Sequence, residues 1–147
     1  MNILIVEDDA FYLDIIVKMV RGWTHDVTCA ESGRAALDKA AAKDFDLFLL
    51  DVFLPDMTAM ELIPKLRSFR PDARIITLTG QSTRELEREI RELGISYYMA
   101  KPASQKELKS ILDHMSRGQK PRTSPSHAPV MGNASRVASR LFVSTAH

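Results

Sequence analysis

Six polar residues follow short apolar runs of this sequence, and together their types suit the binding and transfer of a phosphate group. They are Glu7, Asp8, Asp9, Asp51, Thr79 and Lys101. Carboxylates that gather without histidine or cysteine are ligands for a hard cation, and Mg²⁺ is the usual choice where a phosphate completes its coordination shell. The sequence therefore predicts a magnesium site, provided that the fold brings these residues together.

The acceptor of the phosphate would be Asp51. Its carboxylate can attack phosphorus to form an acyl phosphate, and it needs no general base because an aspartate is ionised at neutral pH. Thr79 and Lys101 would bind the other phosphoryl oxygens, and the ammonium would offset the repulsion between the acids. Taken alone, Asp51 would more often be a turn or capping acid, so the hypothesis depends on the whole set.

Five apolar runs alternate with five segments of helical spacing between residues 1 and 116. The runs are residues 3–6, 27–29, 47–50, 75–78 and 95–100. Short continuous runs are typical of strands buried on both faces, and their alternation with helices predicts a doubly wound α/β fold with a five-stranded parallel sheet. The carboxyl ends of parallel strands meet at one edge, so the six polar residues would converge there.

The helical segments carry start and stop signals. We expect helices at about 11–21, 33–40, 59–69, 83–93 and from 105 onward. Ser82 with Glu85, and Ser104 with Glu107, each match a capping box, which makes the two serines the predicted N-caps. Pro64 inside the third segment predicts a late start or a kink of that helix.

Charge and composition separate a body from a tail. All 19 acidic residues lie within residues 1–116 together with 15 basic ones, whereas residues 117–147 carry five basic residues and no acid. Segment 117–129 is rich in proline and serine, which predicts a flexible linker. Segment 134–143 has an apolar helical face, so it is either a short amphipathic helix that needs a partner or a disordered stretch. We therefore expect a domain at 1–116 and a basic, flexible tail at 117–147.

The compartment follows from cysteine usage and from hydropathy. The single cysteine, Cys29, excludes a disulfide framework and a cysteine-rich zinc site, and it suits a reducing cytosol. The N-terminus lacks the basic start and cleavage site of a signal peptide, and no apolar run is long enough to span a bilayer. We expect a cytoplasmic protein without membrane insertion.

Four motifs in this chain resemble those of the receiver domain of two-component response regulators. They are ILIVEDD at 3–9, DVFLPDM at 51–57, LTG at 78–80 and YMAKP at 98–102. The resemblance covers residues 1–116, points to the stand-alone, chemotaxis-regulator-like type, and implies the flavodoxin-like strand order 2-1-3-4-5. It also implies that a sensor histidine kinase or a histidine phosphotransfer protein donates the phosphoryl group, and that the product signals by contact with a downstream protein.

The resemblance assigns roles to residues as well. The Mg²⁺ ligands it implies are Glu7 through water, Asp8, Asp51 and the backbone carbonyl of Phe53. The catalytic residues are Asp51 as phosphoacceptor, Thr79 and Lys101, and the switch pair is Thr79 and Tyr98. Asp9 is then a neighbour of the acidic pair, and the Lys101–Pro102 bond is expected to be cis.

Three positions depart from the family pattern without removing a catalytic group. Ala59 stands where glycine is usual, which predicts an altered loop or a positive φ. Phe53, two residues past Asp51, is large and apolar, so it would shield an acyl phosphate from water. Ala103 replaces a phenylalanine that is common after the Lys-Pro pair.

Three classes of function remain open. The leading hypothesis is a response regulator receiver that catalyses only its own phosphorylation and dephosphorylation and binds no nucleic acid directly. A homodimer of such a receiver would use the fourth helix, the fifth strand and the fifth helix. The second hypothesis is the receiver half of a truncated DNA-binding transcriptional regulator, which the short tail opposes. The third is a phosphatase of the haloacid-dehalogenase type, which Phe53 opposes because such enzymes have a second aspartate there.

Overall fold

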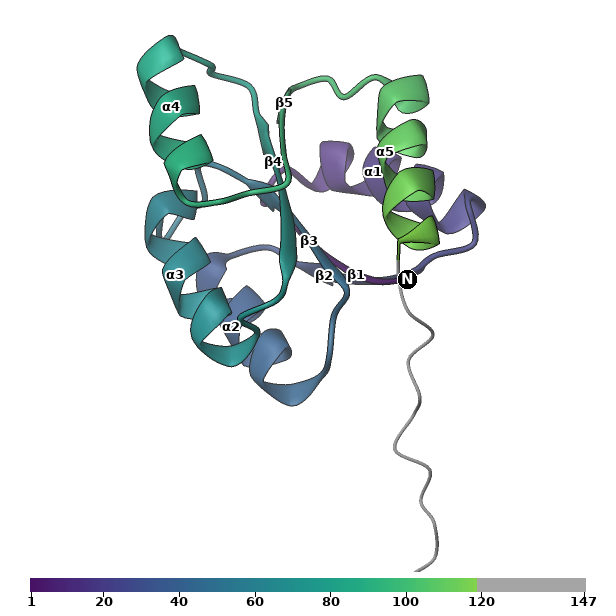
Figure 1. The fold of residues 1–147 in the computed structure, drawn as a ribbon, viewed down its shortest axis with the longest axis horizontal. Helices are drawn as coiled ribbons and strands as arrows, with labels where there is room; N and C mark the ends of the chain where they lie inside the picture. The colour runs from purple at the N-terminus through teal and green to yellow at the C-terminus, as the bar shows by residue number, and fades with distance from the viewer. Residues whose placement is uncertain (119–147) are drawn as a thin grey trace, which may run out of the picture. The chain divides into compact units, whose positions relative to one another are not determined.

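The computed structural model describes residues 1–118, in which five strands alternate with five helices (Figure 1). The strands are β1 (Asn2–Val6), β2 (Asp26–Ala30), β3 (Leu47–Asp51), β4 (Arg74–Thr79) and β5 (Tyr97–Ala100). The helices are α1 (Ala10–Gly22), α2 (Gly33–Ala42), α3 (Ala59–Phe69), α4 (Arg84–Glu92) and α5 (Gln105–Arg117). The alternation expected from the apolar runs is confirmed.

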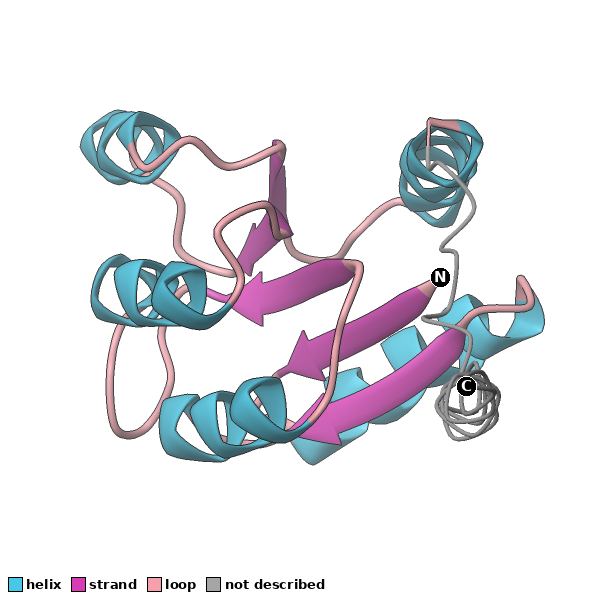
Figure 2. Cartoon of the chain, turned by 60° about the horizontal axis from the view of Figure 1, so that its bottom comes forward, coloured by secondary structure: helices cyan, strands magenta, loops and turns pink. Residues whose placement is uncertain are grey.

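The strands form one parallel sheet in the order β2-β1-β3-β4-β5, as predicted. All of them point the same way, with helices on both sides of the sheet (Figure 2). The register pairs Val6 with Leu50 and Thr79 with Ala100, so that β1, β3, β4 and β5 end along a single edge. This edge is where the polar residues of the sequence were expected to meet.

Two apolar layers enclose the sheet, because alternate residues of each buried strand face opposite sides. Ile3 and Ile5 pack into the layer formed with α1 and α5, whereas Leu4 and Val6 pack into the layer formed with α2, α3 and α4. Figure 1 shows these two helix groups on either side of the sheet. The central strand β3 is buried at every residue, which fixes the position of its last residue, Asp51.

The helix starts follow the predicted caps with one exception. Ser104 Oγ accepts a hydrogen bond from the backbone N–H of Glu107 at 3.3 Å, as expected at the start of α5. The prediction that Ser82 caps α4 is wrong: Thr83 occupies that position, and its Oγ1 accepts from Leu86 N at 3.1 Å. Two hydroxyl residues in sequence were both suitable caps, and the first of them forms a tertiary hydrogen bond instead.

Helix α3 begins at Ala59 and continues through Pro64, so the predicted late start is wrong. An interior proline costs about 3 kcal/mol. The helix buries Leu62, Ile63 and Leu66 completely, and each such side chain contributes roughly 1.5–3 kcal/mol. Burial therefore exceeds the cost of the proline.

Ala59 does not have a positive φ, because Thr24 is the one non-glycine residue with positive φ in the described part of the chain. The Ala59 N–H donates to Val52 O at 2.8 Å, and its side chain is fully buried. A methyl group thus fits at the start of α3 without strain.

The loop between β3 and α3 is fastened to the N-terminus of α2. Asp56 accepts hydrogen bonds from the backbone N–H groups of Gly33 at 2.8 Å and Arg34 at 2.9 Å. These bonds to Arg34 and Gly33 lower the pKa of Asp56 below its usual range, as a helix N-terminus favours a negative charge. The contact holds the loop that follows Asp51.

We predict that Gly33→Ala lowers the free energy of unfolding by about 1–3 kcal/mol. A Cβ at this position would lie 2.4 Å from the Met57 side chain, so that side chain, or the loop that carries it, would have to shift. Urea unfolding measures the change. The control Gly22→Ala meets no atom within 4 Å and should leave stability equal or slightly higher; equal losses in both variants would contradict the steric explanation.

The predicted tail at 117–147 and its helix at 134–143 lie almost wholly outside the described residues, so the domain boundary stays a prediction. Across residues 1–118, none of the helices combines the length and the apolar character needed to cross a bilayer.

Candidate functional site

Three of the predicted metal ligands converge at the carboxyl edge of the sheet. Glu7 and Asp8 follow β1, and Asp51 ends β3; one carboxylate oxygen from each lies within 4.8 Å of the others. Glu7 and Asp51 are buried, at 3% and 8% exposure, whereas Asp8 is exposed. An all-oxygen cluster with one open side fits a hard cation that keeps room for water and phosphate.

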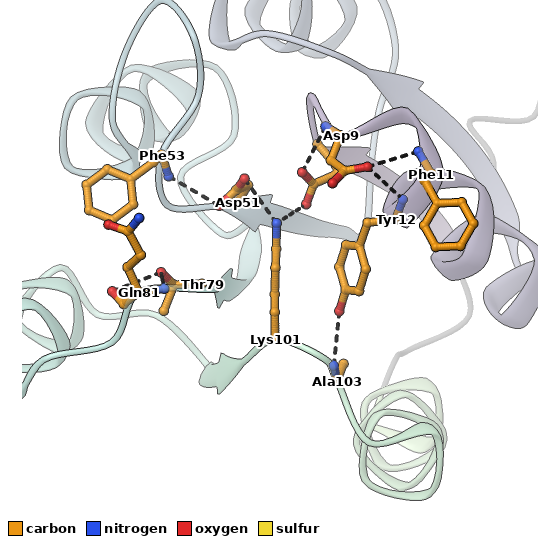
Figure 3. Close-up of polar contacts among 10 residues, drawn as sticks. Asp9, Phe11, Tyr12, Asp51, Phe53, Thr79, Gln81, Lys101 and Ala103 are labelled. Carbon is orange, nitrogen blue, oxygen red and sulfur yellow. Dashed lines mark hydrogen bonds and ion pairs between the residues drawn. The ribbon is translucent and has the colours of Figure 1, made fainter.

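Phe53, the fourth predicted ligand, lies next to this cluster. Its backbone N–H donates to Asp51 Oδ1 at 3.3 Å, and its side chain is 43% exposed (Figure 3). The role of its carbonyl as a metal ligand stays a prediction.

Lys101 joins the two buried acids from the end of β5. Its Nζ forms ion pairs with Glu7 Oε2 and with Asp51 Oδ2, the latter at 3.1 Å, and its side chain is only 18% exposed. The backbone N–H of Lys101 donates to Thr79 O at 2.8 Å, which fixes the strand end. The Lys101–Pro102 peptide is cis, as expected.

The charges of this cluster depend on one another. Burial raises the pKa of Glu7 and the charge of Asp51 adds to this effect, while the hydrogen bond from Lys101 opposes it. Burial alone would lower the pKa of Lys101, but its hydrogen bonds to Glu7 and Asp51 outweigh burial and the pKa is raised. The ammonium is therefore charged at neutral pH and offsets the repulsion between the two carboxylates.

The predicted switch residues both bind the loop between β4 and α4. Thr79 is buried, and its hydroxyl donates to Gln81 O at 3.2 Å and accepts from Gln81 N at 3.1 Å. The Tyr98 hydroxyl lies 2.8 Å from Ser82 Oγ, and the Arg91 guanidinium lies 5.8 Å from the centre of its ring. Thr79 and Tyr98 thus hold consecutive residues of one loop.

The family model described as the response regulator receiver domain matches residues 3–113 of this chain. This chain belongs to the response regulator receiver domain family.

Curated relatives from bacteria match the chain over this domain. The transcriptional regulatory protein ZraR of Escherichia coli O157:H7 is 30% identical over 112 residues, which are 76% of this chain and 25% of that protein. The cell cycle response regulator CtrA of Brucella ovis is 32% identical over 110 residues, 74% of this chain and 47% of that protein. This receiver therefore spans about a quarter of the ZraR chain and about half of the CtrA chain.

Solved structures show the same fold. A CheY-like receiver domain protein from Methanospirillum hungatei superposes with a TM-score of 0.72 at 30% identity, covering 80% of this chain and 98% of that one. A response regulator from Burkholderia pseudomallei, solved with a phosphorylated aspartic acid, a calcium ion and citrate, has a TM-score of 0.71 at 26% identity. That comparison covers 79% of this receiver and 69% of the other chain.

Tyr12 of α1 is a residue of this receiver site that the sequence did not identify. Its hydroxyl accepts a hydrogen bond from Ala103 N at 3.0 Å, and the centre of its ring lies 4.8 Å from Lys101 Nζ. Asp9 accepts from Tyr12 N at 3.0 Å as the cap of α1 (Figure 3), so it supports the site as a neighbour. No local spacing could signal a contact between residues 91 positions apart.

We predict that Mg²⁺ stabilises this receiver by about 1.4 kcal/mol when its concentration is ten times the dissociation constant. The expected cause is binding between the acids of Glu7, Asp8 and Asp51. Thermal or urea unfolding at increasing Mg²⁺ measures the effect. Asp51→Asn should respond far less, whereas Asp38→Asn, which alters an exposed ion pair with Arg34 on α2, should respond fully. An undiminished response of Asp51→Asn would argue against the site.

Proposed function

We propose that this receiver takes a phosphoryl group onto Asp51 from a sensor histidine kinase or a histidine phosphotransfer protein. The observation that supports the proposal is the position of the Asp51 carboxylate, between the acids of Glu7 and Asp8 and the ammonium of Lys101. A nucleophile, a cation site and a fixed positive charge are the three parts that phosphoryl transfer to a carboxylate requires.

In the proposed reaction an oxygen of Asp51 attacks the phosphorus of a phosphohistidine. The new P–O bond forms as the P–N bond breaks, and the imidazole leaves with the bonding electrons and takes up a proton from solvent. Bound Mg²⁺ would neutralise charge on the phosphoryl oxygens. Lys101 would bind one of those oxygens and Thr79 another. The domain would catalyse only its own phosphorylation and dephosphorylation, so it would not be a turnover enzyme for external substrates.

The residues that would hold Mg²⁺ are Glu7 through water, Asp8, Asp51 and the Phe53 carbonyl. The acidic cluster supports the first three, because it supplies only oxygen ligands and leaves Asp8 open to solvent. The carbonyl of Phe53 is included because the resemblance to receiver domains implies it; Phe53 stands two residues past Asp51, and its N–H donates to the Asp51 carboxylate.

The response to phosphorylation would pass through Thr79 and Tyr98. A phosphoryl oxygen that takes the Thr79 hydroxyl would break its hydrogen bonds with Gln81, and the loop would lose a constraint next to Ser82 and Tyr98. A local change of charge can bias such a bistable element. The surface that would then change lies on α4, β5 and α5, where a downstream protein or a second copy would bind.

A second candidate is the receiver portion of a longer DNA-binding regulator. The relatives include the DNA-binding transcriptional regulator NtrC of Azospirillum brasilense. It is 30% identical over 112 residues, which are 76% of this chain and 23% of NtrC. Tight, salt-sensitive binding of DNA by the chain as given would favour this candidate. A natural reading frame that continues into a DNA-binding domain would also favour it, whereas a frame without such a domain would favour signalling by protein contact in the cytoplasm.

We predict that acetyl phosphate with Mg²⁺ adds one phosphoryl group to the wild-type chain and none to Asp51→Asn. The variant lacks the nucleophilic oxygen while keeping the shape of the side chain. Intact-protein mass spectrometry measures the product, and Asp14→Asn on the exposed face of α1 serves as the matched control. Equal labelling of Asp51→Asn would refute the assignment, and repeated turnover of a phosphate ester would favour a phosphatase.

We also predict that Phe53→Asn shortens the lifetime of the acyl phosphate. The backbone N–H of Phe53 donates to Asp51, and its ring is 43% exposed and points toward Gln81 (Figure 3). Replacing this apolar ring with a polar side chain should bring more water to the site. The decay of the phosphorylated form gives the rate. Phe69→Asn is a matched control, since Phe69 is 44% exposed at the end of α3. Unchanged or slower decay of Phe53→Asn would remove the shielding role.

A further inference from the structure

We propose that Tyr12 is a positioning residue for Lys101, holding its ammonium at the strand edge by a cation–π contact and its loop by a hydrogen bond. The inference rests on the proposed function, because it concerns the ammonium that would bind the phosphoryl oxygen. Tyr12 belongs to neither the acidic cluster nor the switch pair.

The geometry joins three separate elements. The Tyr12 ring comes from the first turn of α1, and Lys101 Nζ lies 4.8 Å from its centre, within the roughly 6 Å over which a cation is attracted to a ring face. Ala103 N donates to the Tyr12 hydroxyl at 3.0 Å, so the same side chain also anchors the segment after Pro102 (Figure 3).

The position of Tyr12 is itself fixed. Asp9 Oδ1 accepts hydrogen bonds from the backbone N–H groups of Phe11 and Tyr12, both at 3.0 Å, and the backbone N–H of Asp9 donates to Glu7 Oε1 at 3.1 Å. The start of α1 is thereby tied to the acidic cluster. The backbone of Tyr12 is therefore fixed without a contribution from Lys101.

The need for such a contact follows from competition for the carboxylates. In the described structure Lys101 is bound by Glu7 and Asp51, the acids that would also hold the cation. A divalent ion attracts these oxygens more strongly than an ammonium does, so Lys101 would lose part of its attachment as the site fills. The ion would not compete for the face of the neutral Tyr12 ring. Lys101 would therefore keep this contact and stay oriented toward Asp51.

The contact is also shielded from solvent. The Lys101 side chain is 18% exposed, and Tyr12 packs partly against the apolar layer under α1 and α5. A cation–π contact is stronger where water is excluded, and its loss then corresponds to about a fivefold change in rate or affinity.

Two substitutions separate the ring from the hydroxyl. Tyr12→Leu removes both contacts, and we expect it to lower the rate of labelling by acetyl phosphate at saturating Mg²⁺ about fivefold. Tyr12→Phe keeps the ring and should lose less. Phe11→Leu is the matched control, since Phe11 is 77% exposed and points away from Lys101 (Figure 3).

A double-mutant cycle distinguishes positioning from general packing. If Tyr12 acts through Lys101, then Tyr12→Leu should cause almost no further loss in a Lys101→Gln background. The same fivefold loss in that background, or a wild-type rate for Tyr12→Leu, would overturn the inference. Urea unfolding of all variants shows whether they are folded to the same extent under the labelling conditions.

Nuclear magnetic resonance tests the contacts without metal or phosphate. The Cε protons of Lys101 should show a ring-current shift that is kept in Tyr12→Phe and lost in Tyr12→Leu. Hydrogen exchange of the Ala103 amide should accelerate in both variants, because each lacks the acceptor hydroxyl. Unshifted Lys101 protons in the wild type would defeat this inference alone, whereas an unlabelled wild-type chain would defeat the proposed function.

Discussion

The repulsion between buried carboxylates is the constraint that organises this receiver domain. Glu7 and Asp51 are almost fully buried at the same edge of the sheet, and the ammonium of Lys101 forms an ion pair with each of them. Two carboxylates in a medium of low polarity are costly without a cation, so the fold must deliver a lysine to that point. The parallel sheet does so, because β5 ends beside β4, which pairs with β3.

The helices and loops serve the same edge by different means. Apolar burial fixes β3 and so the position of Asp51, while hydrogen bonds to backbone groups fix the loops around it. Asp56 fastens the following loop to α2, and Tyr12 reaches Ala103 across the site. The apolar layers determine where the strands end, and the polar contacts determine how the side chains at those ends are oriented.

The sequence was sufficient for the α/β alternation and for the acidic cluster, because both depend on local patterns, whereas the strand order came from the resemblance to receiver domains. Apolar runs specify strands, and in parallel strands the residue after each run lies at the common edge. The sequence was not sufficient for Tyr12 or Ser82, whose partners are distant in the chain. Ser82 fitted a capping box, but Thr83 caps α4 and Ser82 binds Tyr98. Glycine is usual at the position of Ala59 in the family, which suggested a positive φ there. Ala59 instead starts α3 without a positive φ.

Thr79 and Tyr98 bind two neighbouring residues of one loop, Gln81 and Ser82. Gln81 and Ser82 share one planar peptide unit, so a large shift of the backbone at one residue also displaces the other. Release of either hydroxyl would therefore disturb the neighbouring contact. If Thr79 and Tyr98 act as the proposed switch, this coupling would make the output sharper than two independent hydrogen bonds would.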